Sequence, residues 1–186
     1  MAKSKNKLGL YIGAAALIFL FVRARRGPKT NYSPMPITDE NIKEAIRKIF
    51  NEFGREKTEK LEQLYRKETS HFRSGQFKGG ASPGMEPSPN TNKTFPYGWK
   101  SLQQFSEAYN IPASAFYITG PYTEGGTGKQ KFFVGFPNVY TAMLFVMYVI
   151  SKRGWNFGKW RAFDETISTN YNNSLNAIVP KITRTF

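Results

Sequence analysis

Residues 132–150, FFVGFPNVYTAMLFVMYVI, are almost entirely apolar, and this run constrains the fold because nearly every side chain in it must leave water. Pro137 and Asn138 divide the run, since proline interrupts regular structure and asparagine is a preferred helix N-cap. We therefore predict a strand over residues 131–136 and a buried helix over residues 139–152. The apolar part of this helix, about twelve residues up to Ile150, is too short to span a bilayer, so the run should form the core of a domain.

The rest of this domain is predicted to be mainly helical. Apolar residues recur at helical spacing in three segments before residue 111 and in one segment near the C-terminus. These segments are residues 38–53, which Gly54 ends, residues 57–72, residues 101–110, and a terminal helix with Tyr171, Leu175 and Ile178 on one side. The β-rich residues 116–122 and 131–136 are joined by the Gly-rich sequence TEGGTG, which predicts one hairpin. We expect an α+β domain.

A second apolar run, residues 8–22, lies outside this domain. The sequence LGLYIGAAALIFLFV is uncharged and is flanked by basic residues on both sides. Such a helix spans about 22 Å, and snorkelling of Lys7 and Arg23 extends its reach toward the ~30 Å of a hydrocarbon core. We predict a transmembrane anchor over residues 1–25, a basic tether over residues 26–37 and a domain over residues 38–186. A cleaved signal peptide is the alternative, and the two basic flanks leave the membrane orientation open.

The formal net charge of +14 is distributed unevenly. Residues 1–38 hold seven Lys or Arg and no acid, which leaves about +7 for the rest of the chain. This excess suits an anionic partner such as a wall polymer, a phospholipid or nucleic acid. Because no basic recognition helix or motif occurs, we expect no specific nucleic-acid partner. The sequence leaves the oligomeric state open.

The amino-acid composition excludes several kinds of catalysis. The chain has no cysteine and one histidine, so a cysteine nucleophile, a thiolate zinc site and a His-rich metal site are excluded within one chain. Glu68 and His71 have the Glu-x-x-His spacing of di-iron helices, but the required second pair is absent. We therefore expect no metal and no cofactor. If the protein is an enzyme, carboxylate chemistry is what remains.

Glu68 lies on the apolar stripe of the helix predicted over residues 57–72. The stripe consists of Leu61, Leu64, Tyr65 and Phe72. Most charged neighbours, Glu62 and Arg66 among them, are expected to point elsewhere. Partial burial and the negative end of a helix both favour a protonated carboxyl group, which is what protonating a glycosidic oxygen requires. The alternative is an acid at the edge of the stripe that pairs with a neighbouring Lys or Arg.

The end of this helix resembles a known signature. Glu68, Thr69, Ser70 and Phe72 are similar to the Glu-Ser-x-Phe motif that closes the catalytic helix of the lysozyme-like superfamily, which includes lytic transglycosylases and cell-wall glucosaminidases. The order of the following segments is also similar: a variable loop over residues 75–96, YGWKSL, a hairpin, a buried helix and a terminal helix with a tyrosine. This resemblance, over about residues 40–180, implies a lysozyme-like fold in which Glu68 is the general acid.

The resemblance also suggests further site residues. Glu124 in the hairpin turn is the candidate second catalytic acid, since that hairpin overhangs the cleft in glucosaminidases; a solvated turn residue is the alternative. Tyr122, Tyr171 and Trp99 are candidates for binding the sugar by stacking or hydrogen bonding, although tyrosines of this kind also occur as core or surface residues. A lytic transglycosylase would need Glu68 alone, whereas a hydrolase would need a second carboxylate.

Together these features predict a membrane-anchored enzyme that cleaves peptidoglycan glycan strands. A bacterial envelope and the internal membrane of a bacteriophage virion are both suitable locations for such an enzyme. The alternative is a non-enzymatic, membrane-anchored protein that binds a wall or capsid component through its basic charge. Whether the enzyme would be a hydrolase or a lytic transglycosylase stays open at this stage.

Overall fold

The computed structural model describes residues 36–87, 100–124 and 127–186. The predicted membrane anchor, residues 8–22, and the predicted sugar-binding residue Trp99 lie outside these ranges. Within them, no helix combines the length and the apolar character needed to cross a membrane.

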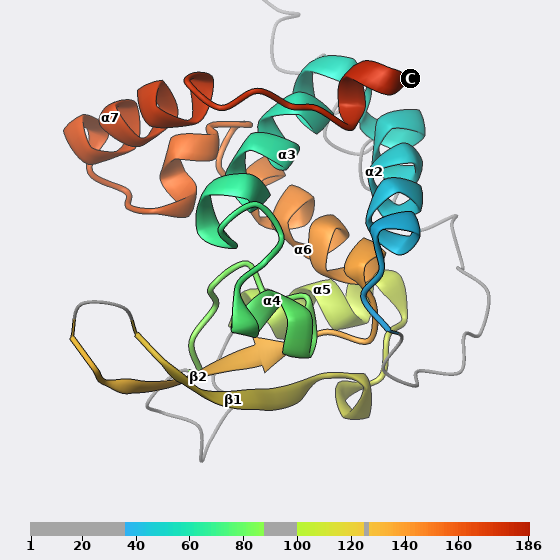
Figure 1. Ribbon diagram of the computed structural model, residues 1–186. Coiled ribbons are helices and arrows are strands. Elements are labelled where there is room, and N and C mark those ends of the chain that lie inside the picture. The colour runs from blue at the N-terminus through green and yellow to red at the C-terminus, as the bar shows by residue number, and fades with distance from the viewer. Residues whose placement is uncertain (1–35, 88–99, 125–126) are drawn as a thin grey trace, which may run out of the picture.

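The described chain is mostly helical and contains one antiparallel hairpin, so the predicted α+β class is confirmed (Figure 1). Its helices are α2 (Asp39–Phe53), α3 (Arg55–Glu68), α4 (Gly75–Gly80), α5 (Lys100–Tyr109), α6 (Val139–Ser151) and α7 (Glu165–Asn176). The strands are β1 (Tyr117–Thr123) and β2 (Gln130–Gly135), and three short 3-10 helices are η1 (Ala113–Ala115), η2 (Phe157–Trp160) and η3 (Thr183–Thr185).

Helix α6 lies at the centre of the core, as its apolar sequence predicted. Asn138 is its N-cap, because the Asn138 side chain accepts a hydrogen bond of 2.8 Å from the backbone N–H of Thr141. Helix α2 packs along α6, and helices α3 and α5 also contact it. Nearly every residue from Val139 to Ile150 is buried, which accounts for the lack of a polar face on this helix.

The hairpin packs against α4, a helix that the sequence did not predict. Residues 75–80 belong to the loop predicted over residues 75–96, a segment without a helical apolar period. Three of these six residues are glycines. The glycines permit a close approach: a Cβ atom on Gly79 would lie only 1.9 Å from the Tyr122 hydroxyl oxygen and 2.7 Å from Thr119 Oγ1. Close packing on the hairpin thus compensates for the low helix propensity of this segment.

Helix α3 is buried over a wider arc than its apolar stripe predicted. Glu62 is fully buried and Arg66 is 9% exposed, so the expectation that both point away from the core was wrong. The reason is the C-terminal segment, which crosses this side of α3 (Figure 1). The Glu62 carboxylate accepts hydrogen bonds from the backbone N–H groups of Ile182 (2.9 Å) and Thr183 (2.7 Å) and from the Thr183 hydroxyl (2.8 Å). It also pairs with Arg66, at 2.7 Å.

We expect Glu62→Ala to lower the free energy of unfolding by about 3–5 kcal/mol, because it leaves the buried Arg66 guanidinium without its partner and releases the C-terminal segment. Urea denaturation followed by circular dichroism measures this change. The matched control is Glu44→Ala on α2, which removes an exposed pair with Lys48 and should leave stability almost unchanged. Similar small losses in the two variants would contradict the structural role of Glu62.

Candidate functional site

Glu68 is the last residue of α3 and is followed by an unusual turn. Ser70, His71 and Phe72 all have left-handed backbone angles, with φ of 48°, 58° and 68°. Such angles are uncommon for residues other than glycine and cost free energy, so the surroundings must hold the turn in place. The half-buried Glu68 side chain therefore projects from a helix end with a fixed backbone.

Thr69 supplies much of this support. Its buried hydroxyl group donates to the carbonyl oxygen of Tyr65 and accepts from the backbone N–H of Phe72, at 3.0 Å. Its carbonyl oxygen accepts from the N–H groups of Arg73 and Ser74, both at 2.9 Å. The Phe72 ring then packs in one cluster with the rings of Tyr65 and Phe77, whose centroids lie 6.3 Å and 5.3 Å from its own. Thr69 and Phe72 of the Glu-Thr-Ser-x-Phe sequence therefore have a structural role: they hold the turn that follows Glu68.

Tyr171 of α7 holds one oxygen of the Glu68 carboxyl group. The Tyr171 hydroxyl donates to Glu68 Oε1, and the tyrosine is 8% exposed. Burial raises the pKa of Tyr171, and the adjacent Glu68 carboxylate raises it further, so the hydroxyl keeps its proton and remains a donor. The sequence predicted that Tyr171 binds sugar, whereas the structure places its hydroxyl on the candidate acid.

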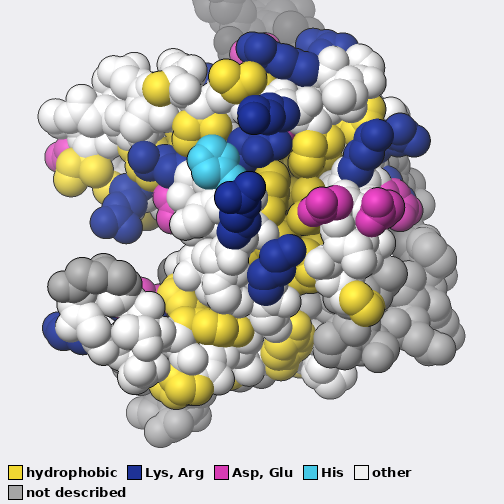
Figure 2. Space-filling model, viewed as in Figure 1, with side chains coloured by type: hydrophobic (Ala, Val, Ile, Leu, Met, Phe, Trp, Pro, Cys, Tyr) yellow, Lys and Arg dark blue, Asp and Glu magenta, His cyan; other side chains and the backbone are white. Residues whose placement is uncertain are grey.

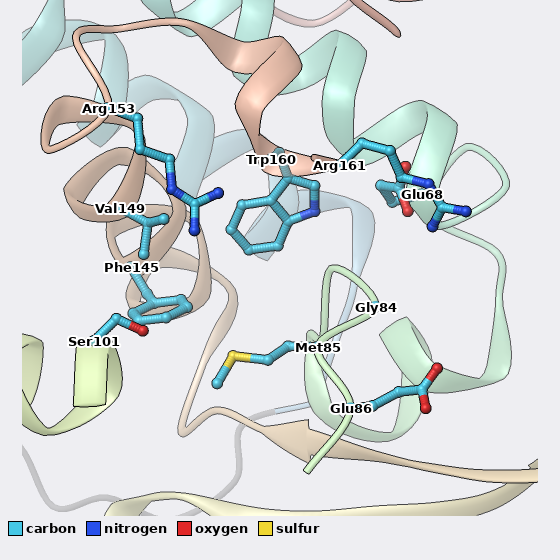
Figure 3. A pocket seen from close by; sticks show the side chains of 10 residues that line it. All are labelled: Glu68, Gly84, Met85, Glu86, Ser101, Phe145, Val149, Arg153, Trp160 and Arg161. Atoms are coloured by element: carbon cyan, nitrogen blue, oxygen red, sulfur yellow. The ribbon is translucent and has the colours of Figure 1, made fainter. Parts of the chain in front are cut away.

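Glu68 lines a cavity of about 270 Å³ (Figure 3). The other lining residues are Gly84, Met85, Glu86, Ser101, Phe145, Val149, Arg153, Trp160 and Arg161. Figure 3 shows Arg161 beside Glu68, Arg153 at the opposite end, and the Trp160 indole between these ends. Two acids, two aromatic rings and two guanidinium groups therefore border one space.

Gly84 lies beside the Glu68 carboxyl group. Its φ of 91° suits glycine, and a Cβ atom at this position would lie 3.6 Å from Glu68 Oε2 and 3.5 Å from Gln76 Nε2. Gln76 in turn donates to the Glu68 carbonyl oxygen at 3.0 Å. Oε1 of Glu68 therefore accepts the hydrogen bond from Tyr171, while Oε2 faces Gly84, which lines the cavity.

Glu124, the predicted second acid, is part of an ion-pair chain on the hairpin. Lys131 Nζ lies 2.8 Å from Glu124 Oε1 and 2.8 Å from Glu86 Oε1. Hydrogen bonds from Lys131 and Thr127 lower the pKa of Glu124, which keeps it ionised near neutral pH. Glu124 does not line the Glu68 cavity, but Glu86, which shares Lys131 with it, does. The cavity therefore holds a second carboxylate that the sequence analysis did not select.

Tyr122, predicted to bind sugar, is half-buried, with its ring packed on the glycines of α4 and its hydroxyl hydrogen-bonded to Thr119. Its ring is therefore placed to hold α4 against the hairpin, and it is not among the cavity residues.

Besides Glu86, the cavity is lined by Arg153, Trp160 and Arg161, which were not predicted from the sequence. They all come from the segment between α6 and α7, whose sequence RGWNFGKWR interleaves aromatic and basic residues. That composition was the available signal, because aromatic and basic side chains together are common in binding sites. The sequence alone could not show that this segment lies across the cavity from the end of α3.

Within the described ranges, no three His, Asp or Glu side chains lie close enough together to hold a metal ion. Comparisons of the chain with models of protein families, with characterised proteins and with solved structures gave no match. The function must therefore be argued from the site itself.

We expect Thr69→Val to lower the free energy of unfolding by about 2 kcal/mol, because valine keeps the shape but leaves the Phe72 N–H without its acceptor. Thr69→Ser keeps the hydroxyl and should retain most of the stability. Chemical denaturation of the two variants gives the comparison. Equal losses in both would mean that the hydroxyl does not hold the turn.

Proposed function

We propose that this protein is a membrane-anchored glycosidase or lytic transglycosylase that cleaves peptidoglycan glycan strands, with Glu68 as the general acid. The observation that carries the proposal is the Glu68 carboxyl group: it is half-buried at a helix end, held at Oε1 by Tyr171, and it borders the 270 Å³ cavity. This arrangement suits an acid that delivers a proton from Oε2 to a bound glycosidic oxygen. The sequence resemblance to the lysozyme-like superfamily supports the same residue.

The neighbouring side chains suit a carbohydrate substrate. The indole of Trp160 offers a flat apolar face and one N–H donor, the combination on which sugar rings commonly stack. Exposed Lys67, Arg73 and Lys78 lie on α3, α4 and the turn between them, and Figure 2 shows basic side chains gathered on this face around the single histidine. A basic surface favours attraction to an anionic polymer such as the bacterial wall. Residues 8–22 supply the proposed membrane anchor.

The surface also has a suitable shape for a long polymer. Figure 2 shows it hollowed between the part that contains α7 and the part that contains the hairpin. In the proposed reaction, the proton of Glu68 moves to the glycosidic oxygen as the bond to the anomeric carbon breaks. The anomeric carbon then forms a bond either to water, which gives a reducing end, or to a hydroxyl of the same sugar, which gives an anhydro end. The proton released passes to a second carboxylate when water attacks, and back to the ionised Glu68 when the hydroxyl attacks.

We expect Glu68→Gln to reduce wall lysis by about 10²-fold or more, because glutamine keeps the size and can still accept from Tyr171 but cannot donate an acid proton. The melting temperature of this variant should stay unchanged or rise, because a neutral amide replaces a partly desolvated carboxyl group that serves activity and not stability. Lysis of purified walls and thermal unfolding are measured on the same preparation. Lysis by Glu68→Gln at the wild-type rate would contradict the catalytic role of Glu68 and favour the non-enzymatic wall-binding alternative.

A matched pair of variants distinguishes the hydrolase from the transglycosylase. Glu86→Gln and Glu124→Gln each remove one of the two carboxylates that share Lys131, so they perturb the same ion-pair chain. If water is the acceptor, we expect Glu86→Gln to lose about 10²-fold in activity and Glu124→Gln to stay near wild type, because Glu86 borders the cavity. Full activity in both variants would identify the single-acid transglycosylase. A larger loss of activity in Glu124→Gln than in Glu86→Gln would identify Glu124 as the second catalytic carboxylate.

A further inference from the structure

Arg153 is a half-buried cation at the end of the cavity away from Glu68 (Figure 3). Its Nη1 group donates to the carbonyl oxygen of Lys159, and its guanidinium lies over the Phe163 ring, 4.6 Å from the centroid. Burial lowers the pKa of Arg153, although an arginine stays charged at any physiological pH. The side chain is thus fixed in direction while it still carries N–H donors beyond the one that Lys159 accepts.

No carboxylate in the described part of the chain neutralises this guanidinium. The ion pairs there involve other cations, namely Lys48, Arg55, Arg66 and Lys131. The two acids that line the cavity are engaged elsewhere, Glu68 with the Tyr171 hydroxyl and Glu86 with Lys131. A partly desolvated cation without a counter-ion costs free energy, and a bound anion would recover that cost.

The position of Arg153 fits a substituent of the same substrate. Trp160 separates Arg153 from Glu68, so a sugar ring over the indole would have its glycosidic oxygen toward the acid and its substituents toward the guanidinium. A guanidinium matches a planar carboxylate because two parallel N–H groups can donate to its two oxygens. A neutral sugar substituent would not supply the missing charge.

We infer that Arg153 and Trp160 form a subsite that binds a carboxylate carried by the glycan strand, so that the enzyme selects acidic over neutral strands. This inference rests on the proposed function, since it names the substrate class of the same site. The carboxylate can be on the lactyl ether of the muramic sugar or on its stem peptide. Both have the same chemistry, and the experiment distinguishes them.

The test uses the full-length protein and two pairs of soluble glycan fragments. One pair has had its stem peptides removed, which leaves a free lactyl carboxylate, and the other keeps the peptides. Within each pair, one sample has its carboxylates converted to methylamides. The variants are Arg153→Gln, Arg153→Lys, which keeps the charge, and Lys181→Gln, an exposed control on the C-terminal segment outside the cavity.

We expect wild type and Lys181→Gln to cleave carboxylated fragments with a kcat/KM about tenfold higher than that of the methylamides, in at least one pair. The pair that shows the preference identifies the source of the carboxylate. Arg153→Gln should lose this preference through a higher KM, and Arg153→Lys should regain part of it. A thermal unfolding curve of Arg153→Gln measured beside the wild-type protein shows that the variant is folded, and the cleavage of methylamides that it retains shows that its acid works.

Three results would overturn the inference. Wild type that cleaves both members of each pair equally would show that no carboxylate is read, while leaving the proposed function intact. An equal loss on carboxylated and methylamidated fragments in both Arg153 variants would make Arg153 a structural residue. Wild type that cleaves no fragment of either pair would remove the proposed function, and this inference with it.

Discussion

The hydroxyl group of Thr69 fixes the backbone that carries the candidate acid, and the rest of the site is built around that fixed point. By bonding to Tyr65 on one side and to Phe72 on the other, it ends α3 at Glu68 and holds the left-handed residues that follow. Phe72 then enters the core, and α4 begins a few residues later. Because α4 supports the hairpin and Gln76 bonds to the Glu68 carbonyl oxygen, the same turn positions both the acid and one side of the cavity.

The opposite side of the cavity depends on contacts between distant parts of the chain. Arg153, Trp160 and Arg161 follow α6, and Tyr171 reaches Glu68 from α7. Gly158 packs directly against the backbone of α7, since a Cβ atom there would lie 2.0 Å from the Ser168 carbonyl oxygen. The segment that carries the guanidinium groups and the helix that carries Tyr171 are therefore packed against one another beside Glu68.

Local patterns in the sequence predicted most of the helices, the hairpin and the position of Glu68 near the end of a helix, because apolar spacing and capping residues act over a few neighbours. Asn138 as an N-cap and the stripe formed by Leu61, Leu64 and Tyr65 are examples. The prediction was wrong or silent where the deciding contact is long-range. Glu62 is buried because residues 182–183 donate to it, and α4 forms because its glycines fit under the hairpin. Glu86 and Arg153 needed the tertiary fold before their place beside the cavity could be seen.

The central claim is that Glu68 protonates a glycosidic oxygen of the bacterial wall, and the covalent products test it most directly. Purified walls are incubated with the full-length protein and with Glu68→Gln, and the soluble fragments are identified by mass spectrometry. The account predicts glycan fragments with new anhydro or reducing ends from the wild-type protein and almost none from the variant. Walls that release no glycan fragments, or equal release by both proteins, would contradict it.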